Sequence, residues 1–261
     1  MPELLIVGGG RMGEALLGGL LAAGRAAGDL AVMEIAPGRR DALAGAFPGV
    51  AIVDAPVAAA GAVLAVKPAD VPEAARAVAD AGAQRILSVA AGVTTRAIEA
   101  AAGRTLPVVR AMPNTPALVG AGAAAISAGS SAAEGDMAWA EGILGAVGVV
   151  VRVPEKALDA VTGLSGSGPA YVLLVAEAMA DAGVLAGLPR DVAETLAFQT
   201  LLGTARLLDE AAEGPAALRA AVTSPGGTTA AGLRELERHG VRAALLDAVT
   251  AAAERSRELG S

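Results

Sequence analysis

The sequence predicts an α/β protein in which a doubly wound, mostly parallel sheet is followed by an all-helical region. Two observations carry this prediction. From Leu4 to about Val153, short apolar runs of strand length alternate with alanine-rich stretches of helix length, as in successive βαβ units. After Pro154 the strand-like runs end, and only stretches typical of helices follow. We therefore divide the chain into a sheet-containing domain, residues 1–153, and a helical domain, residues 154–261.

The first strand and the turn after it carry the clearest motif. Leu4 to Val7 are apolar, and Gly8, Gly10 and Gly13 follow in the spacing G-x-G-x-x-G before an apolar-periodic helix. Gly8 allows the turn, Gly10 lets the backbone approach a pyrophosphate, and Gly13 lets the helix pack close to its strand. In a chain with 34 glycines an ordinary βα turn is the alternative. The strand before the cluster and the helix after it favour a Rossmann-type dinucleotide site.

Glu34 supports the same interpretation. It follows the second apolar run, Leu30 to Met33, and lies 21 positions beyond Gly13. An acidic residue about 20 positions after the motif accepts a hydrogen bond from a ribose 2′-hydroxyl. Because a carboxylate repels a 2′-phosphate, Glu34 weakly favours NADH over NADPH. Arg39 and Arg40 follow closely enough in sequence to weaken this preference.

Further apolar runs extend the sheet, and helices fill the second half of the chain. The remaining predicted strands are Val50 to Val53, Ala62 to Val66, Arg85 to Val89, Pro107 to Arg110, Ala123 to Ile126 and Val147 to Val153, the last two flanking a helix at about Ala132 to Leu144 and closing the sheet. The later predicted helices are Glu155 to Thr162, Gly168 to Ala186, Arg190 to Ala211, Pro215 to Val222, Thr228 to Arg238 and Val241 to Leu259. Their broad apolar faces indicate a dimer interface.

Composition excludes several kinds of partner. The net charge of −7 and the absence of a basic run argue against a nucleic-acid partner. The chain has no cysteine and one histidine, so we predict no metal site. The longest apolar stretch, Ala170 to Leu188, is interrupted by Glu177 and Asp181, and the first strand begins too early for a signal peptide. We therefore expect a cytoplasmic protein that does not span a membrane.

Polar residues follow two strands at the edge where an open α/β sheet binds its ligand. Lys67 follows the fourth strand, where it would contact ribose or phosphate, with a solvated loop lysine as the alternative. Asn114 follows the sixth strand, between two prolines, where it would hydrogen-bond near a nicotinamide. Ordinary turn chemistry explains Asn114 equally well.

Two glycine–serine clusters mark the helical half. Residues 162–171 read TGLSGSGPAY and residues 223–229 read TSPGGTT, each ending at a predicted helix start. Free N–H groups and hydroxyls at such positions bind a carboxylate or cap the helix. The single histidine, His239, lies near a helix C-terminus, where it interacts with the helix dipole. Since no serine–histidine–aspartate set can form without it, the chemistry is expected to come from a cofactor, as in hydride transfer.

At these residues the sequence resembles the pyrroline-5-carboxylate reductases. The similar motifs are GGGRMGEAL at 8–16, AVKP at 65–68, VAAGV at 89–93, MPNTPA at 112–117, DAVTGLSGSGPAY at 159–171 and VTSPGGTTAAGL at 222–233. The resemblance implies a Rossmann domain followed by a helical dimerisation domain, with homodimers in some cases assembled into larger rings. It also implies NADPH- or NADH-dependent reduction of 1-pyrroline-5-carboxylate, a small-molecule substrate, to L-proline.

The resemblance further implies roles for individual residues. Ser224 and Thr229 would be catalytic, with Thr229 hydrogen-bonding the imine nitrogen or relaying a proton to it. The implied substrate-binding residues are Glu155, Ser224, Gly226, Gly227, Thr228 and Thr229. The implied cofactor-binding residues are Gly8, Gly9, Gly10, Arg11, Met12, Gly13, Glu34, Val66, Lys67, Pro68, Ala91 and Asn114.

Two other interpretations of the sequence are considered beside this resemblance. The β-hydroxyacid dehydrogenases also join a Rossmann domain to a helical one, but their catalytic lysine on the first long helix has no counterpart after Gly168. A catalytically silent NAD(P)-binding protein is the second alternative. Such a protein need not keep the Ser224 to Thr229 cluster.

Overall fold

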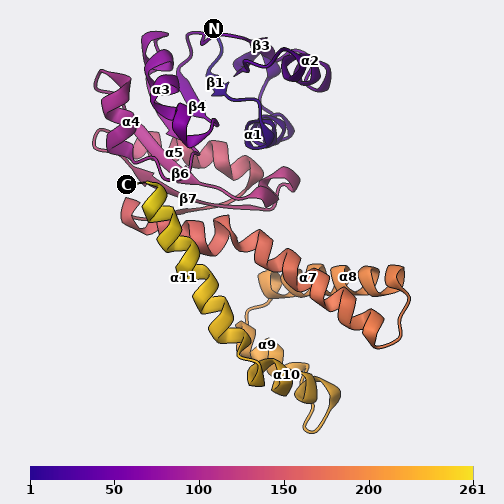
Figure 1. Ribbon diagram of the computed structural model, residues 1–261. Helices are drawn as coiled ribbons and strands as arrows, with labels where there is room; N and C mark the ends of the chain where they lie inside the picture. Colours follow the sequence, from indigo (N-terminus) through magenta and orange to yellow (C-terminus); the bar gives the residue numbers. More distant parts are fainter. Residues whose placement is uncertain (261) are drawn as a thin grey trace. The chain divides into compact units, whose positions relative to one another are not determined.

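The computed structural model describes residues 1–260, and its first half is built on one eight-stranded sheet. The strand order is β3-β2-β1-β4-β5-β6-β7-β8, which confirms the predicted doubly wound α/β fold (Figure 1). All neighbouring pairs are parallel except β6 and β7. The strands are β1 Leu4–Val7, β2 Leu30–Met33, β3 Ala51–Val53, β4 Gly61–Leu64, β5 Ile86–Ser88, β6 Val108–Met112, β7 Gly122–Ala128 and β8 Gly148–Arg152.

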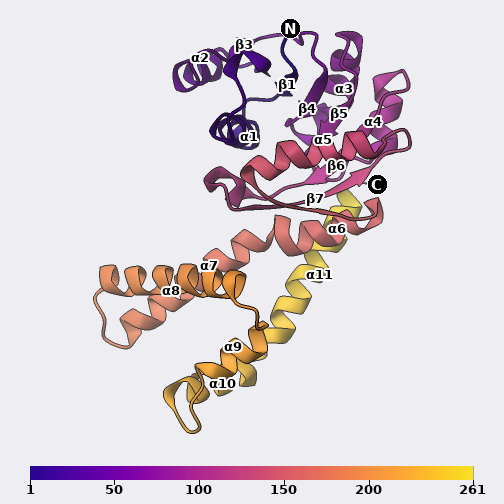
Figure 2. The same cartoon turned by 180° about the vertical axis from the view of Figure 1, so that it is seen from behind.

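Helices cover both faces of this sheet. Alternate residues of β1 enter different cores: Leu4 and Ile6 pack with α1 and α5, whereas Leu5 and Val7 pack with α3 and α4. Helices α3 and α4 lie in front of the sheet in Figure 1, and α5 lies in front of it in Figure 2. The helices of this half are α1 Arg11–Ala22, α2 Pro37–Ala46, α3 Val71–Asp80, α4 Thr95–Ala102 and α5 Glu134–Leu144.

The second half is helical, as predicted. Its helices are α6 Leu158–Val161, α7 Gly168–Leu185, α8 Arg190–Glu210, α9 Pro215–Ala221, α10 Thr228–Arg238 and α11 Val241–Leu259. Helices α7 and α8 pack through small residues: Ala176 and Ala180 of α7 and Ala193 and Ala197 of α8 are buried. At Gly183 a Cβ atom would lie 3.0 Å from the Ala193 Cβ, so the two helices approach closely at this glycine.

The chain forms two compact units. The first comprises residues 1–167 together with the chain from Thr250 onward, and the second comprises Gly168–Val249. The end of α11 therefore belongs to the unit that contains the sheet. There the Ser256 hydroxyl donates to Asp159 Oδ1 at 2.7 Å, which fixes the last turns of α11 to α6.

The first glycine–serine cluster ends at a helix start, as predicted, because α7 begins at Gly168, but most of its residues before that point are already helical. Residues Thr162–Gly166 form a π-helical turn that continues α6 toward α7, and the Ser167 N–H donates to the Thr162 carbonyl. The Thr162 and Ser165 hydroxyls donate to carbonyls four residues earlier. Because helical bonding uses the hydroxyls of Thr162 and Ser165, these two groups are not free to bind an anion.

Large apolar side chains remain exposed on α7 and α8 within the second unit. They include Val172, Leu173, Leu174, Leu196 and Phe198. Exposed apolar area of this extent on a helical hairpin is typical of a surface that another protein covers.

One helical stretch of the described chain, Glu155–Leu185, is long and apolar enough to cross a membrane by length and composition. Such a match is by itself weak evidence for a span.

Candidate functional site

The glycine-rich turn after β1 has the geometry expected of a dinucleotide loop. Gly8 has a φ of +103°, and a Cβ atom there would lie 2.5 Å from the Ala65 carbonyl oxygen. A Cβ atom at Gly13 would overlap the Gly8 carbonyl oxygen, which confirms that this glycine lets α1 pack close to its strand. Apart from Gly10 itself and its two chain neighbours, no described residue has an atom within 4 Å of a Cβ atom built at Gly10. The loop is therefore packed on the Gly8 and Gly13 side and open at Gly10.

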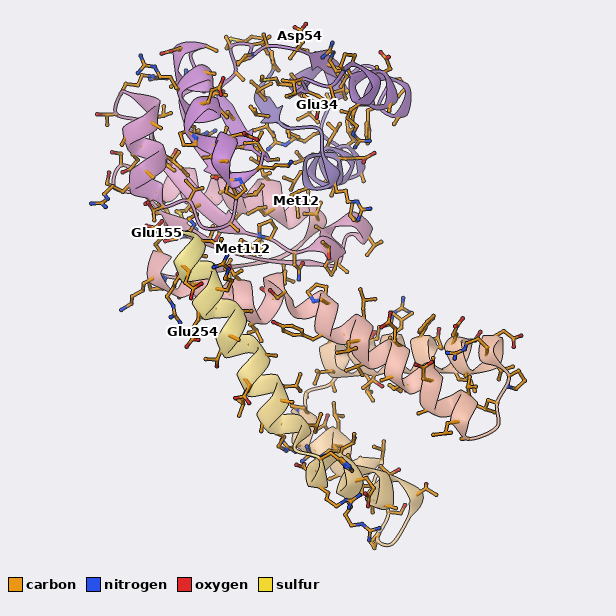
Figure 3. All side chains as sticks on the ribbon, in the orientation of Figure 1. Met12, Glu34, Asp54, Met112, Glu155 and Glu254 are labelled. Carbon is orange, nitrogen blue, oxygen red and sulfur yellow. The ribbon has the colours of Figure 1, made fainter. Side chains whose placement is uncertain are left out.

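The N-terminus of α1 begins at this open position. Gly10 is the N-cap of α1 and supplies no side-chain cap, so the first N–H groups of the helix remain available to a phosphate. Arg11 and Met12 are the first two residues of the helix, and Met12 is labelled in Figure 3. These features fit the pyrophosphate of a dinucleotide.

Glu34 follows β2 and reaches back to the glycine-rich turn (Figure 3). Its Oε2 accepts a hydrogen bond from the Gly9 N–H at 3.0 Å, and its Oε1 accepts one from the Ala36 N–H at 2.9 Å. A carboxylate has about four lone-pair positions. Glu34 therefore keeps acceptor capacity for a ribose hydroxyl while it holds the turn.

Both arginines near Glu34 have partners within the protein. Arg39 donates from Nε to the Gly9 carbonyl oxygen at 2.6 Å and from Nη2 to Glu14 Oε2 at 2.6 Å. Arg40 donates from Nη1 to the carbonyl oxygens of Glu34 and Ile35, at 3.0 and 2.8 Å. These contacts were not predictable from the proximity of the arginines in sequence.

The other predicted cofactor residues lie at the C-terminal edge of the sheet. Val66 lies against Gly8, since its Cγ1 is 3.1 Å from a Cβ atom built there. Lys67 is exposed, and its side chain has no hydrogen bond or ion pair among residues 1–260. Pro68 begins the short 3-10 helix that follows. Ala91 is half-buried in the loop after β5.

Asn114 uses its amide to join neighbouring segments. Its Nδ2 donates to the Ser165 carbonyl oxygen at 3.1 Å, and its Oδ1 accepts from the Ala123 N–H at 2.8 Å. The structure thus shows a connecting role for Asn114 at the start of β7. A further hydrogen bond from its second amide hydrogen toward a nicotinamide stays a prediction.

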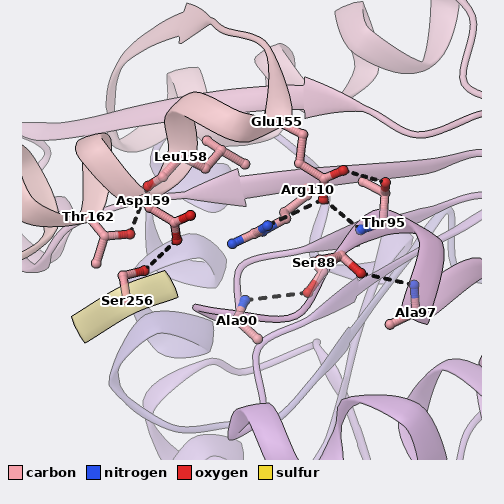
Figure 4. Close-up of polar contacts among 11 residues, drawn as sticks. Ser88, Ala90, Thr95, Ala97, Arg110, Glu155, Leu158, Asp159, Thr162 and Ser256 are labelled. Carbon is pink, nitrogen blue, oxygen red and sulfur yellow. Dashed lines mark hydrogen bonds and ion pairs between the residues drawn. The ribbon is translucent and has the colours of Figure 1, made fainter. Parts of the chain in front are cut away.

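Glu155 lies in a polar network within the first unit (Figure 4). Its carboxylate accepts from the Thr95 N–H at 2.7 Å and from Thr95 Oγ1 at 2.9 Å. It also lies 3.3 Å from Arg110 Nη1, whose side chain is 7% exposed. Glu155 therefore connects the start of α4 to β6, and its predicted contact with substrate stays a prediction.

Sequence reasoning missed Thr95 and Arg110 as members of this network. The available signal was Arg110 itself, because an arginine in a strand buried on both faces needs a partner. That partner, Glu155, is 45 residues away in sequence.

The second cluster forms the turn between α9 and α10 and opens onto a helix start. The Gly227 N–H donates to the Ser224 carbonyl oxygen at 3.0 Å, and Gly226 has a φ of +70°. Gly227 is the N-cap of α10 and supplies no side-chain cap, so the N–H groups of Thr228 and Thr229 remain available. Within residues 1–260, the hydroxyls of Ser224, Thr228 and Thr229 have no hydrogen-bond partner. This helix start presents free donors.

His239 is placed as the sequence predicts. It is the C-cap of α10, and its Nδ1 lies 2.9 Å from the Glu235 carbonyl oxygen, which makes it a partner of the helix C-terminus. Across residues 1–260 no group of three or more histidine, cysteine, aspartate or glutamate side chains has a metal-binding arrangement.

The doubly wound sheet, the open glycine-rich turn and Glu34 after β2 define a dinucleotide-dependent oxidoreductase. Two family models match parts of the chain. Residues 3–92 match a model described as "NADP oxidoreductase coenzyme F420-dependent". Residues 155–259 match one described as "Pyrroline-5-carboxylate reductase dimerisation", which indicates an oligomer.

Individual relatives extend over the whole length. The chain is 47% identical to the pyrroline-5-carboxylate reductase of Synechocystis sp. over 99% of this chain and 98% of that protein. It superposes on a pyrroline-5-carboxylate reductase from Coxiella burnetii with a TM-score of 0.93 and 35% identity, covering 100% and 99% of the two chains. For a Plasmodium falciparum pyrroline carboxylate reductase with NADP bound, the TM-score is 0.86, the identity 28% and the coverage 100% and 98%. The chain belongs to the pyrroline-5-carboxylate reductase family.

Proposed function

We propose that this protein reduces 1-pyrroline-5-carboxylate to L-proline with NADH or NADPH, the final step of proline synthesis. One structural observation carries the proposal: two separate helix starts, at Gly10 and at Gly227, have free donors and no side-chain cap. The first fits a pyrophosphate and the second fits a carboxylate. The names of the full-length relatives support the same activity.

The second helix start would bind and orient the substrate. The N–H groups of Thr228 and Thr229 and the Ser224 hydroxyl would hold the carboxylate, with Gly226 and Gly227 shaping the turn. Fixing the carboxylate restricts the direction in which the imine carbon faces, and such orientation lowers the barrier without covalent chemistry.

When bound, a nicotinamide dinucleotide would supply the hydride that reduces the imine carbon. The imine nitrogen must be protonated at or before this step. The Thr229 hydroxyl has no protein acceptor among residues 1–260, so it is free to hydrogen-bond the nitrogen or relay a proton to it. Ser224 assists by holding the carboxylate.

The cofactor would be held along the C-terminal edge of the sheet. The proposed contacts are Gly8, Gly9, Gly10, Arg11, Met12, Gly13, Glu34, Val66, Lys67, Pro68, Ala91 and Asn114. Glu34 gives the site a weak preference for NADH, because its carboxylate accepts from a 2′-hydroxyl and repels a 2′-phosphate. We also propose that Glu155 contributes to substrate binding, in addition to its contacts with Thr95.

We further propose that residues 1–153 form the dinucleotide-binding domain and residues 154–261 the dimerisation and substrate-binding domain. The family model that begins at residue 155 supports this division. The exposed apolar side chains of α7 and α8 support a homodimer built on these helices. We also propose that the dimers assemble into larger rings and that the protein is cytoplasmic.

An oxidation assay tests the activity. The near-ultraviolet absorbance of NADH and of NADPH is followed with and without 1-pyrroline-5-carboxylate, and the product is identified by chromatography. Substrate-dependent loss of absorbance with proline as product supports the proposal. Tight dinucleotide binding without turnover would instead favour a silent dinucleotide-binding protein.

A further inference from the structure

Arg39 and Glu14 form an ion pair beside the glycine-rich turn. Arg39 Nη2 lies 2.6 Å from Glu14 Oε2, and the two side chains are 33% and 36% exposed. Glu14 lies in the first turn of α1 and Arg39 in the first turn of α2. The pair therefore joins the helix that follows β1 to the helix that follows β2.

The same arginine holds the peptide groups of the turn. The Gly9 N–H donates to Glu34 while the Gly9 carbonyl accepts from Arg39 Nε. Gly9 is buried, and a Cβ atom built at this residue would overlap the Leu43 side chain and lie 3.2 Å from Glu34 Oε2. Glu34, the residue that would contact the ribose, and Arg39 are thus both hydrogen-bonded to one glycine.

This arrangement determines which charges are available to a 2′-phosphate. A phosphate monoester carries close to two negative charges near neutral pH. A 2′-phosphate therefore needs a cation beside it, whereas a 2′-hydroxyl at the same position needs only a hydrogen-bond acceptor. Glu34 is an anion at that position. Arg39 is a cation in contact with the same turn, but it is paired with Glu14 and its Nε is bound to Gly9. Arg40 donates from Nη1 to two backbone carbonyl oxygens, those of Glu34 and Ile35.

We propose that Glu14 is a specificity-determining residue of the dinucleotide site. By pairing with Arg39, it withholds the cation that a 2′-phosphate requires and so selects NAD(H) over NADP(H). Glu14 acts through Arg39 and does not itself contact the cofactor. This inference rests on the proposed function, since it assumes that the glycine-rich turn binds a nicotinamide dinucleotide.

The test is the ratio of two dissociation constants, for NADPH and for NADH, measured by fluorescence titration of the full-length protein without substrate. The Glu14→Gln variant keeps the size of the side chain and removes its charge. We expect this variant to bind NADPH about tenfold more tightly relative to NADH, the effect of one charge-assisted hydrogen bond at a partly exposed position.

Two further variants identify the cause. Asp41→Asn removes a negative charge from α2 at a residue without a partner among residues 1–260, and it should leave the ratio unchanged. Glu14→Gln combined with Arg39→Met should lose the tenfold shift, because the released cation is gone. Circular dichroism spectra that match the unsubstituted protein confirm that each variant is folded.

The outcomes separate this inference from the function on which it rests. An unchanged ratio in Glu14→Gln, or a shift that persists without Arg39, would overturn the role of Glu14 while leaving substrate-dependent turnover intact. Binding of neither dinucleotide would overturn both the inference and the proposed function.

Discussion

The same substitution at two glycines of one turn should affect different properties: the stability of the fold at Gly8 and the binding of the cofactor at Gly10. In Gly8→Ala the new Cβ would lie 2.5 Å from the Ala65 carbonyl oxygen, which is 0.9 Å inside the 3.4 Å limit of ordinary contact, at a φ of +103°. Overpacking costs about 1–3 kcal/mol, and the left-handed backbone adds about 1–2 kcal/mol for a residue with a Cβ. We expect Gly8→Ala to lower the free energy of unfolding by about 2–5 kcal/mol.

Gly10→Ala should instead weaken cofactor binding in a stable protein. Gly10 has a φ of −68° and open space around its Cβ position, so alanine fits without strain. The new methyl group would occupy the face where the pyrophosphate approaches the backbone. Loss of one charge-assisted hydrogen bond, about 1.5–3 kcal/mol, corresponds to a roughly 10- to 100-fold larger Kd for NADH.

Thermal unfolding and fluorescence titration with NADH measure both quantities for each variant. The reasoning fails if Gly10→Ala binds NADH as tightly as the unsubstituted protein, because the pyrophosphate would then not approach this backbone. It fails equally if Gly8→Ala unfolds at an unchanged temperature.

Three other variants probe the substrate site, the cofactor preference and the sheet edge. Thr229→Ala should lower kcat about 10- to 1000-fold, and unchanged steady-state kinetics would remove Thr229 from the mechanism. Glu34→Ser should raise kcat/KM for NADPH relative to NADH, and a strong NADPH preference in the unsubstituted protein would contradict the role of Glu34. Hydrogen bonds from Arg152 lower the pKa values of Glu134 and Glu141 below the usual 4.5, so their stabilising effect is present above pH 4.5 and is lost as the pH falls through the lowered values. NMR titration of Arg152→Gln should therefore show both pKa values nearer 4.5, and unchanged values would contradict this cause.

The sheet was largely predictable from the sequence because most of its strands, all but the edge strands β3 and β8, are short, buried runs bounded by glycine-rich or polar turns. β1 and β2 have the predicted bounds. The closing strands β7 and β8 were also predicted, although the antiparallel pairing of β7 with β6 was not. Pairing direction depends on how the chain returns to the sheet, which local periodicity does not record.

The two glycine–serine clusters show where local patterns fail. Both end at a helix start, but only the turn before α10 follows a non-helical segment, since a π-helical turn leads into α7. In the first cluster, Thr162 and Ser165 bond back to the preceding turn, and a π-helical turn carries the chain into α7. Hydroxyl groups cap a new helix or continue an old one according to the backbone around them.

Contacts over long sequence separations were not predictable for the same reason. Glu155 with Thr95 and Arg110, and Arg39 with Glu14, are brought together only by the folded sheet and its helices. The sequence shows which residues are carboxylates and which are cations. Which carboxylate pairs with which cation is decided by the tertiary structure.

Transfer of an isotopic label tests the central proposal most directly. The protein is supplied with 1-pyrroline-5-carboxylate and NADH that carries deuterium at nicotinamide C4 on the transferred face, with the opposite face labelled in a parallel reaction. Mass spectrometry of the product should show proline with one deuterium atom from one of the two labelled cofactors. Unlabelled proline from both cofactors, or no proline despite bound NADH, would contradict direct hydride transfer by this protein.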